Sequence, residues 1–469
     1  MERTGLARSL SMTTATAIVV GSVIGSGIFK KTAGMSEALP SPLLVLGVWV
    51  LAGAVTFLGA LSAAELSAAF PESGGLYAHL RRVTGRFSGF LYGWSVLAVI
   101  QTGSIASVAY IFAQYLGYFV PLPAAPPEWE AWGATLFGTI DLYPFRELPT
   151  KCVAVGCVLV VTVLNTAGVR LGAAVQDLFL WLKVAIMAGI VAVAAFGAGS
   201  FEHVTAPALI PEGMSGMALL GALTIATSGA FWAYDGWINV TYVAGELRDP
   251  ARDMPRALAR GLGIVVASYV AVNLAYFWLL PVAEIRGSTL VAADALGRVL
   301  PFAAAAVSAA VIVSTFGAAN AMALSSARVY WAMARDGVFF EAVGRVHPKR
   351  QTPHVALLVQ GVWASALVFS GTFDQITDML IFVSWAFYGL LALAVVVARV
   401  RFPDAPRPFK VPGYPFVPIV FVLFAAAYVV MSVIENTRNA LLGTALVLLG
   451  LPVWAWFVRG RRRPPEVRG

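Results

Sequence analysis

Glycine and serine interrupt an apolar segment near the amino terminus, in the stretch GSVIGSGIFK at residues 21–30. Each glycine inside a helix costs up to about 1 kcal/mol relative to alanine. The serine hydroxyls in the same stretch compete with the helix for backbone hydrogen bonds. We therefore expect the helix to unwind at this point and to leave backbone groups free for other partners.

A break of this kind can bind a zwitterion. One half-helix ends in carbonyls with partial negative charge, and the other begins with N–H groups of partial positive charge. The carbonyls of Val23 and Ile24 would accept from an ammonium, and the N–H groups around Ser26 and Gly27 would donate to a carboxylate. Gly25 and Gly27 leave room for the ligand's backbone. The alternative is close helix packing, which a lone G-x-x-x-G pattern also produces.

A second break is predicted in the sixth apolar segment, which contains TSGAFWAYDGWINVTYVAGELRDP at 227–250. Gly229 and Gly236 flank aromatic residues and an acid, Asp235, at membrane depth. Unpaired backbone groups cannot face lipid, so both breaks must face a polar cavity. The Asp235 carboxylate either binds the distal positive group of a cationic ligand or caps exposed backbone N–H groups. The sequence leaves both interpretations open.

One lysine, Lys183, lies near the centre of an apolar segment. A charge there costs about 2.5–3.5 kcal/mol on insertion scales, so a functional role is the default expectation. Its ammonium can satisfy carbonyls, or hydroxyls such as those of Ser22 and Ser314, without an imported ion. The alternative is a structural pair with Asp177, but a separation of six residues places the two on different helix faces.

The elements that carry these residues are membrane helices. The chain has 469 residues, of which 59% are hydrophobic and 12% charged, and its mean hydropathy is +0.80. About 20 apolar residues cross the hydrocarbon core, and we predict twelve such spans in an all-α polytopic membrane protein. The longest stretch between spans, 121–150, is predicted to be an ordered loop. The spans are 12–34, 42–66, 88–120, 151–169, 174–197, 217–244, 257–281, 301–326, 354–371, 374–398, 415–434 and 438–458.

The distribution of basic residues predicts the orientation. Of the 32 lysines and arginines, 24 fall at one end of the predicted bundle and seven at the other, while Lys183 lies within a span. Because basic residues are retained on the cytoplasmic side, we place both termini there. Topology thus explains the net charge of +8, and a nucleic-acid partner is not expected. Cys152 and Cys157 lie five apart in one predicted helix, where a disulfide does not fit.

Matching breaks in the first and sixth spans are typical of an inverted repeat. The two breaks are five spans apart, and this odd number inverts the second unit relative to the first. We therefore expect residues 1–200 to form the first inverted repeat and residues 201–400 to form the second. Residues 401–469 would add spans eleven and twelve.

Six ordered blocks of sequence give the chain a resemblance to a known family. It resembles the amino acid permeases of the amino acid, polyamine and organocation (APC) superfamily, and most closely prokaryotic members of the L-type amino acid exchanger branch. The resemblance covers nearly the whole chain and implies a LeuT-like fold, a 5+5 inverted repeat with broken helices 1 and 6. The blocks are GSVIGSGIF, AAELSAAFPESGGLYAHL, VQDLFLWLK, FWAYDGW, GELRDPARDMPRAL and STFGAANAMALSSARVYWAMARDG.

The resemblance implies roles for particular residues at the first and sixth spans. It implies a carboxylate site at Ser26 and Gly27 and an amino-group site at Val23 and at the backbone of Trp232 and Ala233. It also implies that Trp232 is a gate. A large aromatic side chain beside an unwound stretch can swing over a ligand and exclude water, although packing is the alternative.

The resemblance further implies that Lys183, with Ser314 nearby, takes the place of a bound cation, and hence that transport needs no sodium. The implied function is alternating-access exchange of small to medium neutral L-amino acids in the plasma membrane. Exchange of cationic and neutral amino acids, proton-coupled symport and a transporter-like amino acid sensor are the alternatives. Eukaryotic light chains of this branch use a cysteine in the loop after span three to join a heavy chain. Residues 121–149 contain no cysteine, so no disulfide-linked heavy chain is expected.

Other functional classes lack their signatures in the sequence. The histidines fall in predicted loops or at a helix start, and no metal or nucleophile constellation is visible. We therefore expect neither an enzyme nor a cofactor or metal site. A channel would show a continuous row of polar residues along a helix or a filter-like loop, and the sequence shows neither. The four histidines are His79, His203, His347 and His354.

Overall fold

The computed structural model describes residues 10–460, apart from 73, 137–139, 168, 208–215, 349 and 351. Nearly all regular structure in this part of the chain is helical. The first half contains α1 (Met12–Val23), α2 (Gly27–Ala38), α3 (Pro42–Ala69), α4 (Leu76–Val83), α5 (Arg86–Ser95), the π-helix η1 (Val96–Ile100), α6 (Gln101–Leu116), α7 (Pro127–Ala131), strands β1 (Ala134–Leu136) and β2 (Ile140–Leu142), α8 (Leu148–Ala167), α9 (Val169–Phe196) and α10 (Phe201–Val204).

The second half of the chain continues the same bundle. It contains α11 (Met217–Tyr234), the 3-10 helix η2 (Trp237–Glu246), α12 (Pro250–Leu279), α13 (Val282–Gly287), α14 (Val291–Gly297), α15 (Pro301–Arg335), the 3-10 helix η3 (Glu341–Gly344), α16 (His354–Ser370), α17 (Phe373–Arg401), α18 (Phe416–Glu435), α19 (Thr437–Leu448) and α20 (Gly450–Gly460).

Local sequence explains where several of these helices begin. Pro42, Pro250 and Pro301 stand in the first turn of α3, α12 and α15, where a helix needs no backbone N–H donor. Ser11 and Asp249 cap α1 and α12, and each side chain accepts a hydrogen bond from a backbone N–H of the first turn.

Nine helices of the described part are long and apolar enough to cross a membrane, and the bent pair α1–α2 makes a tenth. The two other predicted spans, 174–197 and 354–371, correspond to α9 and α16. Of these, α16 has 17 residues, and the apolar part of α9 for which side chains are described is Leu182–Phe196. The polytopic helical architecture is therefore confirmed, while the number twelve stays a prediction.

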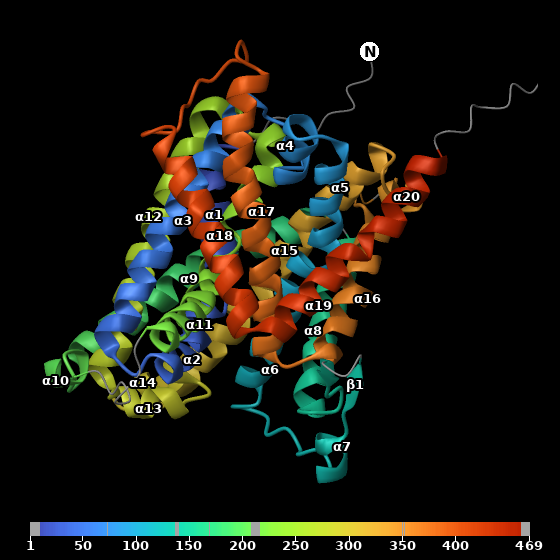
Figure 1. Cartoon of the computed structure of the whole chain (residues 1–469). Helices are drawn as coiled ribbons and strands as arrows, with labels where there is room; N and C mark the ends of the chain where they lie inside the picture. Colours follow the sequence, from blue (N-terminus) through green and yellow to red (C-terminus); the bar gives the residue numbers. More distant parts are fainter. Residues whose placement is uncertain are drawn as a thin grey trace, which may run out of the picture.

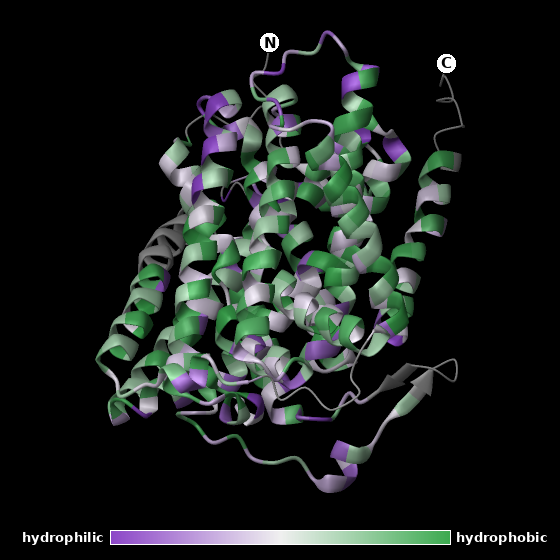
Figure 2. Cartoon of the chain, turned by 60° about the vertical axis from the view of Figure 1, so that its left-hand side comes forward, coloured by the Kyte–Doolittle hydropathy of each residue, from purple (hydrophilic) through white to green (hydrophobic). Residues whose placement is uncertain are grey.

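The helices run between two ends that are richer in polar residues. Figure 2 shows hydrophobic residues along the middle of the helices, with hydrophilic ones gathered toward the loops. In Figure 1, α1 begins and α20 ends on the same side of the bundle, which is also the side of α4, whereas α7, α13 and α14 lie on the opposite side. We call these the α4 end and the α7 end. An even number of crossings returns the chain to the end at which it began.

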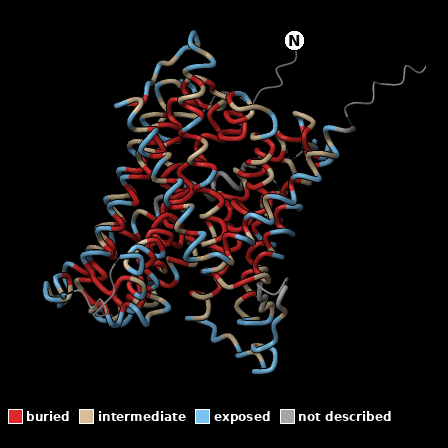
Figure 3. The backbone as a smooth tube through the Cα atoms, viewed as in Figure 1, coloured by how far each residue is buried: buried red, intermediate tan, exposed pale blue. Residues whose placement is uncertain are grey.

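Burial increases from the periphery of the bundle to its centre (Figure 3). In the span formed by α5, η1 and α6, 94% of an apolar stretch of 18 residues is buried inside the protein. The corresponding share is 28% in α18 and 11% in the joined helices α19 and α20. Large apolar side chains such as Phe196 and Leu423 are exposed on the outer helices. Such a surface suits hydrocarbon surroundings rather than water.

The predicted ordered loop at 121–150 contains short regular elements that the sequence analysis did not predict. The helix α7 precedes a two-stranded antiparallel sheet in which Ala134 of β1 stands opposite Leu142 of β2. These elements are too short to show a hydrophobic period, so no sequence pattern predicts them.

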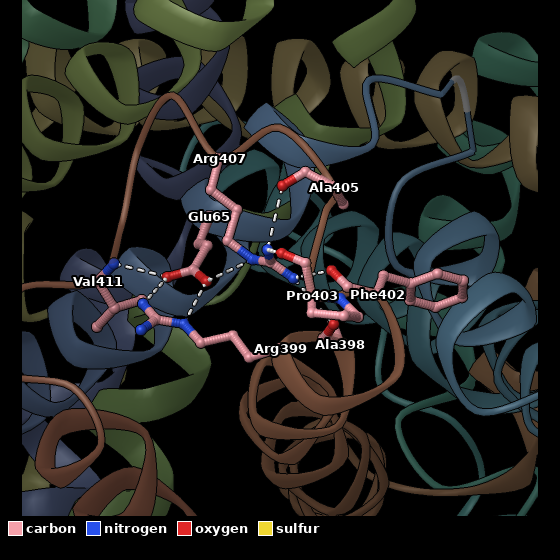
Figure 4. Close-up of polar contacts among 8 residues, drawn as sticks. All are labelled: Glu65, Ala398, Arg399, Phe402, Pro403, Ala405, Arg407 and Val411. Atoms are coloured by element: carbon pink, nitrogen blue, oxygen red, sulfur yellow. Dashed lines mark hydrogen bonds and ion pairs between the residues drawn. The ribbon is translucent and has the colours of Figure 1, made fainter.

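A buried charge cluster fixes the connection between α17 and α18 at the α4 end (Figure 4). Glu65 of α3 accepts from Arg399 through both carboxylate oxygens, at 2.8 and 2.7 Å, and from the backbone N–H of Val411 at 2.7 Å. Arg407 lies 3.9 Å from the same carboxylate. Its guanidinium also donates to carbonyls at and beyond the carboxyl end of α17, where few backbone N–H donors remain. Those carbonyls belong to Ala398, Phe402, Pro403 and Ala405.

Candidate functional site

The first helix break lies within the predicted stretch. α1 ends at Val23, α2 begins at Gly27, and the two helices are bent by 42°. Gly27 is needed because a Cβ at this position would lie 2.5 Å from the Cα of Ala233. The break therefore brings the backbone of the first span into direct contact with the sixth.

The second break lies at Asp235 and Gly236, between α11 and η2. Asp235 has extended backbone angles, and Gly236 has a φ of +99°, a conformation that residues with a Cβ rarely adopt. A Cβ at Gly236 would also lie 2.6 Å from the carbonyl oxygen of Ser22. The two breaks thus cross at two contacts, Gly27 with Ala233 and Gly236 with Ser22.

Three of the last carbonyls of α1 have identifiable donors. The Val20 carbonyl accepts from the Ile24 N–H at 2.8 Å, the Gly21 carbonyl from the Lys183 ammonium at 2.9 Å, and the Val23 carbonyl from the Tyr269 hydroxyl at 2.8 Å. In an intact helix, N–H groups of the following turn would satisfy these oxygens. Side chains from α9 and α12 therefore supply part of what the interrupted helix lacks.

Lys183 reaches a different partner from the hydroxyls suggested by the sequence. Its side chain is 1% exposed, and its ammonium donates to the Gly21 carbonyl rather than to Ser22 or Ser314. The Ser314 hydroxyl is buried and has no hydrogen-bond partner among the described residues. The ammonium binds the carbonyl because α1 ends beside α9 with an oxygen that has no intrahelical donor. This feature depends on the tertiary position of the break. The side chain of Asp177 lies outside the described residues.

The amino terminus of α2 provides donors for an anion. Ser26 precedes the first helical residue, and its side chain makes no capping hydrogen bond. The Ser26 hydroxyl is buried without a partner in the described part of the chain. The first N–H groups of any helix also lack intrahelical acceptors. A carboxylate placed here would be met by backbone N–H groups, the helix dipole and one hydroxyl.

A narrow cavity lies where the two breaks meet. Of the eight residues predicted to contact a ligand, seven line this cavity and Ile24 does not, although Ile24 is buried at the break. Three further lining residues, Ser104 and Val108 of α6 and Met322 of α15, were not predicted as site residues. The complete lining is Ser22, Val23, Gly25, Ser26, Gly27, Ser104, Val108, Trp232, Ala233, Asp235 and Met322.

Trp232 lies between this cavity and an ion pair toward the α7 end. Its ring packs edge-on against Phe373 of α17, with centroids 5.0 Å apart and an interplanar angle of 90°. The Lys31 ammonium lies 4.5 Å from the Phe373 ring and 5.6 Å from the Trp232 ring, and donates to Asp374 at 2.7 Å. The indole therefore joins α11, α2 and α17 on the α7 side of the cavity.

Asp235 faces the cavity but is already engaged by the protein. Its carboxylate accepts from the Tyr388 hydroxyl of α17 at 2.6 Å and from the backbone N–H of Gly236. The side chain is 7% exposed. The contact with the Gly236 N–H is the capping arrangement that was one of the two interpretations of the sequence. The contact with Tyr388 was not predicted.

Contacts at the α4 end join the same two spans. Leu10 forms a parallel bridge with Leu247, in which the Leu10 N–H donates to the Glu246 carbonyl and the Arg248 N–H donates to the Leu10 carbonyl, both at 3.0 Å. Arg328 of α15 adds an ion pair with Glu246 at 3.1 Å. The start of α1 and the end of η2 are therefore tied together on the α4 side of the cavity.

No cluster of three or more histidine, cysteine, aspartate or glutamate side chains within the described residues could hold a metal ion.

A family model described as amino acid permease matches residues 10–455. This match covers both helix breaks, Lys183 and every residue that lines the cavity.

Relatives of known activity align over nearly the whole chain. The human (Homo sapiens) b(0,+)-type amino acid transporter 1 is 30% identical over 464 residues, which cover 97% of this chain and 89% of the human protein. The mouse (Mus musculus) Asc-type amino acid transporter 1 is 30% identical over 465 residues, covering 99% and 83% of the two chains. The human large neutral amino acids transporter small subunit 2 is 31% identical over 464 residues, covering 98% and 82%.

Proposed function

The chain belongs to the amino acid permease family and is a secondary transporter of amino acids rather than an enzyme, and we propose that it exchanges small to medium neutral L-amino acids across the membrane without sodium. In this proposal the ligand lies where the two helix breaks cross, and the residues lining that cavity form the binding site.

The crossing of the breaks is the observation that carries the proposal. On one side, Val23 and Ala233 line the cavity, and the carbonyl of each lies within hydrogen-bond distance of the Tyr269 hydroxyl. On the other, the amino terminus of α2 and the Ser26 hydroxyl have unused donors. An α-amino acid carries an ammonium and a carboxylate on one carbon, and its charges match these two sets of groups. The side chain is then left to the apolar lining of Val108 and Met322.

Contacts at each of the two ends of the cavity support alternating access. Opening toward the α7 end would require Trp232 to leave Phe373 and Lys31 to leave Asp374. Opening toward the α4 end would require separation of Leu10 from Leu247. The excess of basic residues at the α4 end supports a cytoplasmic position for that end and for both termini. The proposed pairing of 1–200 with 201–400 as inverted repeats fits a mechanism in which the two openings alternate.

Lys183 supports the sodium-independent form of the proposal. Its ammonium lies on a terminal carbonyl of α1, 2.9 Å from the oxygen. A sodium ion would be attracted to such carbonyls in the same way. A permanently attached cation removes the need for an imported one.

Cationic amino acids are the second candidate substrates, because Asp235 lines the cavity. The proposal favours neutral substrates, since Tyr388 and the Gly236 N–H already occupy the carboxylate. One relative is named as a small subunit. For this chain we propose transport without a disulfide-linked partner, because residues 121–149 contain no cysteine and both cysteines are free.

Counterflow into liposomes tests the proposal. Purified protein is reconstituted into vesicles loaded with one unlabelled amino acid at a time, and the uptake of labelled L-alanine is followed. We expect uptake with internal alanine, serine or leucine and none with empty vesicles. Equal uptake by loaded and empty vesicles would contradict exchange, and uptake driven only by internal arginine or lysine would favour the cationic candidate.

A further inference from the structure

Three arginines lie along the outer face of α12 near the α4 end. Arg252, Arg256 and Arg260 recur every four residues, which places them on one side of the helix. All three are exposed, whereas Met254 and Leu258 between them are buried against the bundle. Because α12 is long and apolar enough to cross a membrane, its outer face meets lipid. The arginines therefore stand where that face enters the bilayer.

These three arginines differ from others at the same end, which pair with acids. Arg328 pairs with Glu246 and Arg399 with Glu65. Among the described residues, no ion pair involves the three guanidinium groups of α12. Arg260 lies inside the predicted span 257–281, where a charge without a partner costs free energy. An anion outside the protein would supply that partner.

An apolar groove continues from Arg260 toward the middle of the membrane. Its volume is about 560 Å³, within the range of about 300–1,000 Å³ that is typical of ligand sites. The walls come from α1, α9 and α12, which pack against one another (Figure 1). Besides Arg260, the lining includes Thr16 and Val20 of α1, Val184 of α9 and Gly263 of α12.

Gly263 keeps this groove open. A Cβ at Gly263 would meet nothing within 4 Å, whereas a Cβ at Gly261 would lie 2.6 Å from the Cβ of Val19. Helices α1 and α12 therefore touch at Gly261 and leave space beside Gly263. Because the walls of this space are mostly apolar and it opens to the outer face of a spanning helix, a hydrocarbon chain suits it better than water.

A second hollow borders the same arginines nearer the start of α12. Arg252 and Arg256 line it together with Phe409, from the connection between α17 and α18. The acid in its lining, Asp249, is already engaged, since its carboxylate accepts from the backbone N–H of Arg252 at 3.3 Å. Guanidinium groups bind phosphate oxygens well. A phosphate beside these arginines and a chain in the groove are the two parts of one phospholipid.

We propose that this face of α12 binds an anionic phospholipid, with its phosphate between Arg256 and Arg260 and one acyl chain in the groove beside Gly263. A headgroup with net negative charge is favoured because basic clusters at the membrane surface attract anionic lipids. The cationic part of a zwitterionic headgroup would instead be repelled by the same arginines.

The proposed chain would lie beside the first helix break. It would contact Val20 and Val184, which are adjacent in sequence to Gly21 and Lys183, the pair that joins α1 to α9. A bound lipid would therefore support α1 in this position from the membrane side. The inference does not depend on which amino acid the protein carries.

Lipid titrations of the purified full-length protein test this inference. Dioleoylphosphatidylglycerol or dioleoylphosphatidylcholine is added in detergent, and native mass spectrometry gives the dissociation constant of the first bound lipid. We expect the wild type to bind phosphatidylglycerol more tightly. Arg256→Gln/Arg260→Gln should weaken phosphatidylglycerol about thirtyfold, since each arginine contributes roughly fivefold. Gly263→Leu, which fills the groove and keeps the arginines, should weaken it about tenfold, as the loss of roughly two buried methylene groups would.

Two variants are matched controls. Arg345→Gln/Arg350→Gln removes two exposed arginines from the connection that follows α15 at the α4 end. Gly47→Leu adds a side chain at another exposed glycine where a Cβ meets nothing within 4 Å. We expect both controls to bind phosphatidylglycerol as the wild type does, and melting temperatures in detergent verify that all four variants are folded.

Equal affinity of the wild type for the two lipids would overturn the inference. Equal losses in the two arginine variants would also overturn it, because they would indicate diffuse attraction to the whole basic surface. Displacement of the lipid by excess inorganic phosphate would identify a soluble anion as the occupant, and unchanged binding to Gly263→Leu would exclude a chain in the groove. Either result would contradict a phospholipid site.

Discussion

The backbone of Gly236 lies directly against the carbonyl of Ser22, so that a Cβ at position 236 would come within 2.6 Å of that oxygen. Gly236 also has a φ of +99°. These two facts make the crossing of the helix breaks dependent on the absence of one side chain. The crossing in turn defines the cavity, because residues on both sides of the contact line it.

Gly236→Ala is therefore expected to separate the two breaks and to lower both stability and exchange. The strained backbone alone costs about 1–3 kcal/mol, and the contact with Ser22 adds to this. The melting temperature in detergent and the rate of exchange in liposomes are the measurements. Gly34→Ala is the control, since a Cβ there meets nothing within 4 Å. A Gly236→Ala protein with wild-type stability and exchange would show that the crossing is not needed.

Trp232→Ala is expected to slow exchange more than it weakens binding. We propose that Trp232, whose indole packs against Phe373, acts as a gate, and a gate acts on the closed intermediate rather than on ligand contacts. We expect the exchange rate to fall about tenfold, equivalent to about 1.4 kcal/mol, with a smaller change in the dissociation constant of L-alanine. Calorimetry and counterflow on the same preparation compare the two quantities. Equal losses in rate and affinity would identify Trp232 as a packing residue.

Asp235→Asn separates a capping role from a ligand-binding role. Because Tyr388 and the Gly236 N–H already engage the carboxylate, we expect the variant to slow all substrates by a similar factor. Tyr388→Phe should have a related effect, since it removes one of the same contacts. If the carboxylate binds a distal cation instead, arginine and lysine exchange should fall roughly tenfold, or about 1.4 kcal/mol. Unchanged alanine and leucine exchange beside that fall would contradict the capping role.

His79 is expected to make the protein less stable in acid. It lies in α4, outside the spanning helices, where its Nε2 donates to the Phe70 carbonyl at 3.2 Å and burial lowers its pKa from 6.5 to about 4. The unfolded chain binds a proton near pH 6.5 and the folded chain does not, so stability falls as the pH drops from about 6.5 to 4. The loss is roughly 3 kcal/mol at most.

The contribution of His79 can be measured with His79→Gln, which offers an amide donor to the same carbonyl and does not titrate. Melting temperatures of both proteins are recorded in detergent between pH 7.5 and pH 4.5. We expect the wild type to lose more of its melting temperature over this range than the variant does. Parallel curves would mean that His79 is protonated without cost and that other groups determine the acid sensitivity.

The sequence predicted the helix breaks because glycine leaves a local signal. Gly27 and Gly236 stand in apolar segments where helices otherwise avoid glycine, and both breaks lie within the predicted stretches. Lys183 was equally visible, since a lone charge in an apolar run is rare. The carbonyl partner of Lys183 could not be predicted, because the sequence does not show which oxygen lies beside α9.

The supporting tyrosines could not be predicted from sequence. Tyr269 and Tyr276 stand in the same apolar helix with similar neighbours. Of these two, Tyr269 is the one whose hydroxyl lies within hydrogen-bond distance of carbonyls at both breaks. Tyr388 reaches Asp235 across 153 residues of chain. Such contacts depend on how the helices pack, and the hydrophobic pattern does not encode which tyrosine points inward at one particular depth. For the same reason, Ser104 and Met322 were not predicted as site residues.

The initial rate of L-alanine counterflow, measured in sodium and in choline solutions of equal ionic strength, is the direct test of sodium-independent exchange. Lys183 occupies a terminal carbonyl of α1 with a fixed ammonium, 2.9 Å from the Gly21 oxygen, so we expect the same rate in both solutions. The rate should depend only on internal amino acid. A rate that collapses when choline replaces sodium would overturn sodium-independent exchange, because the break would then need an imported cation that Lys183 does not replace.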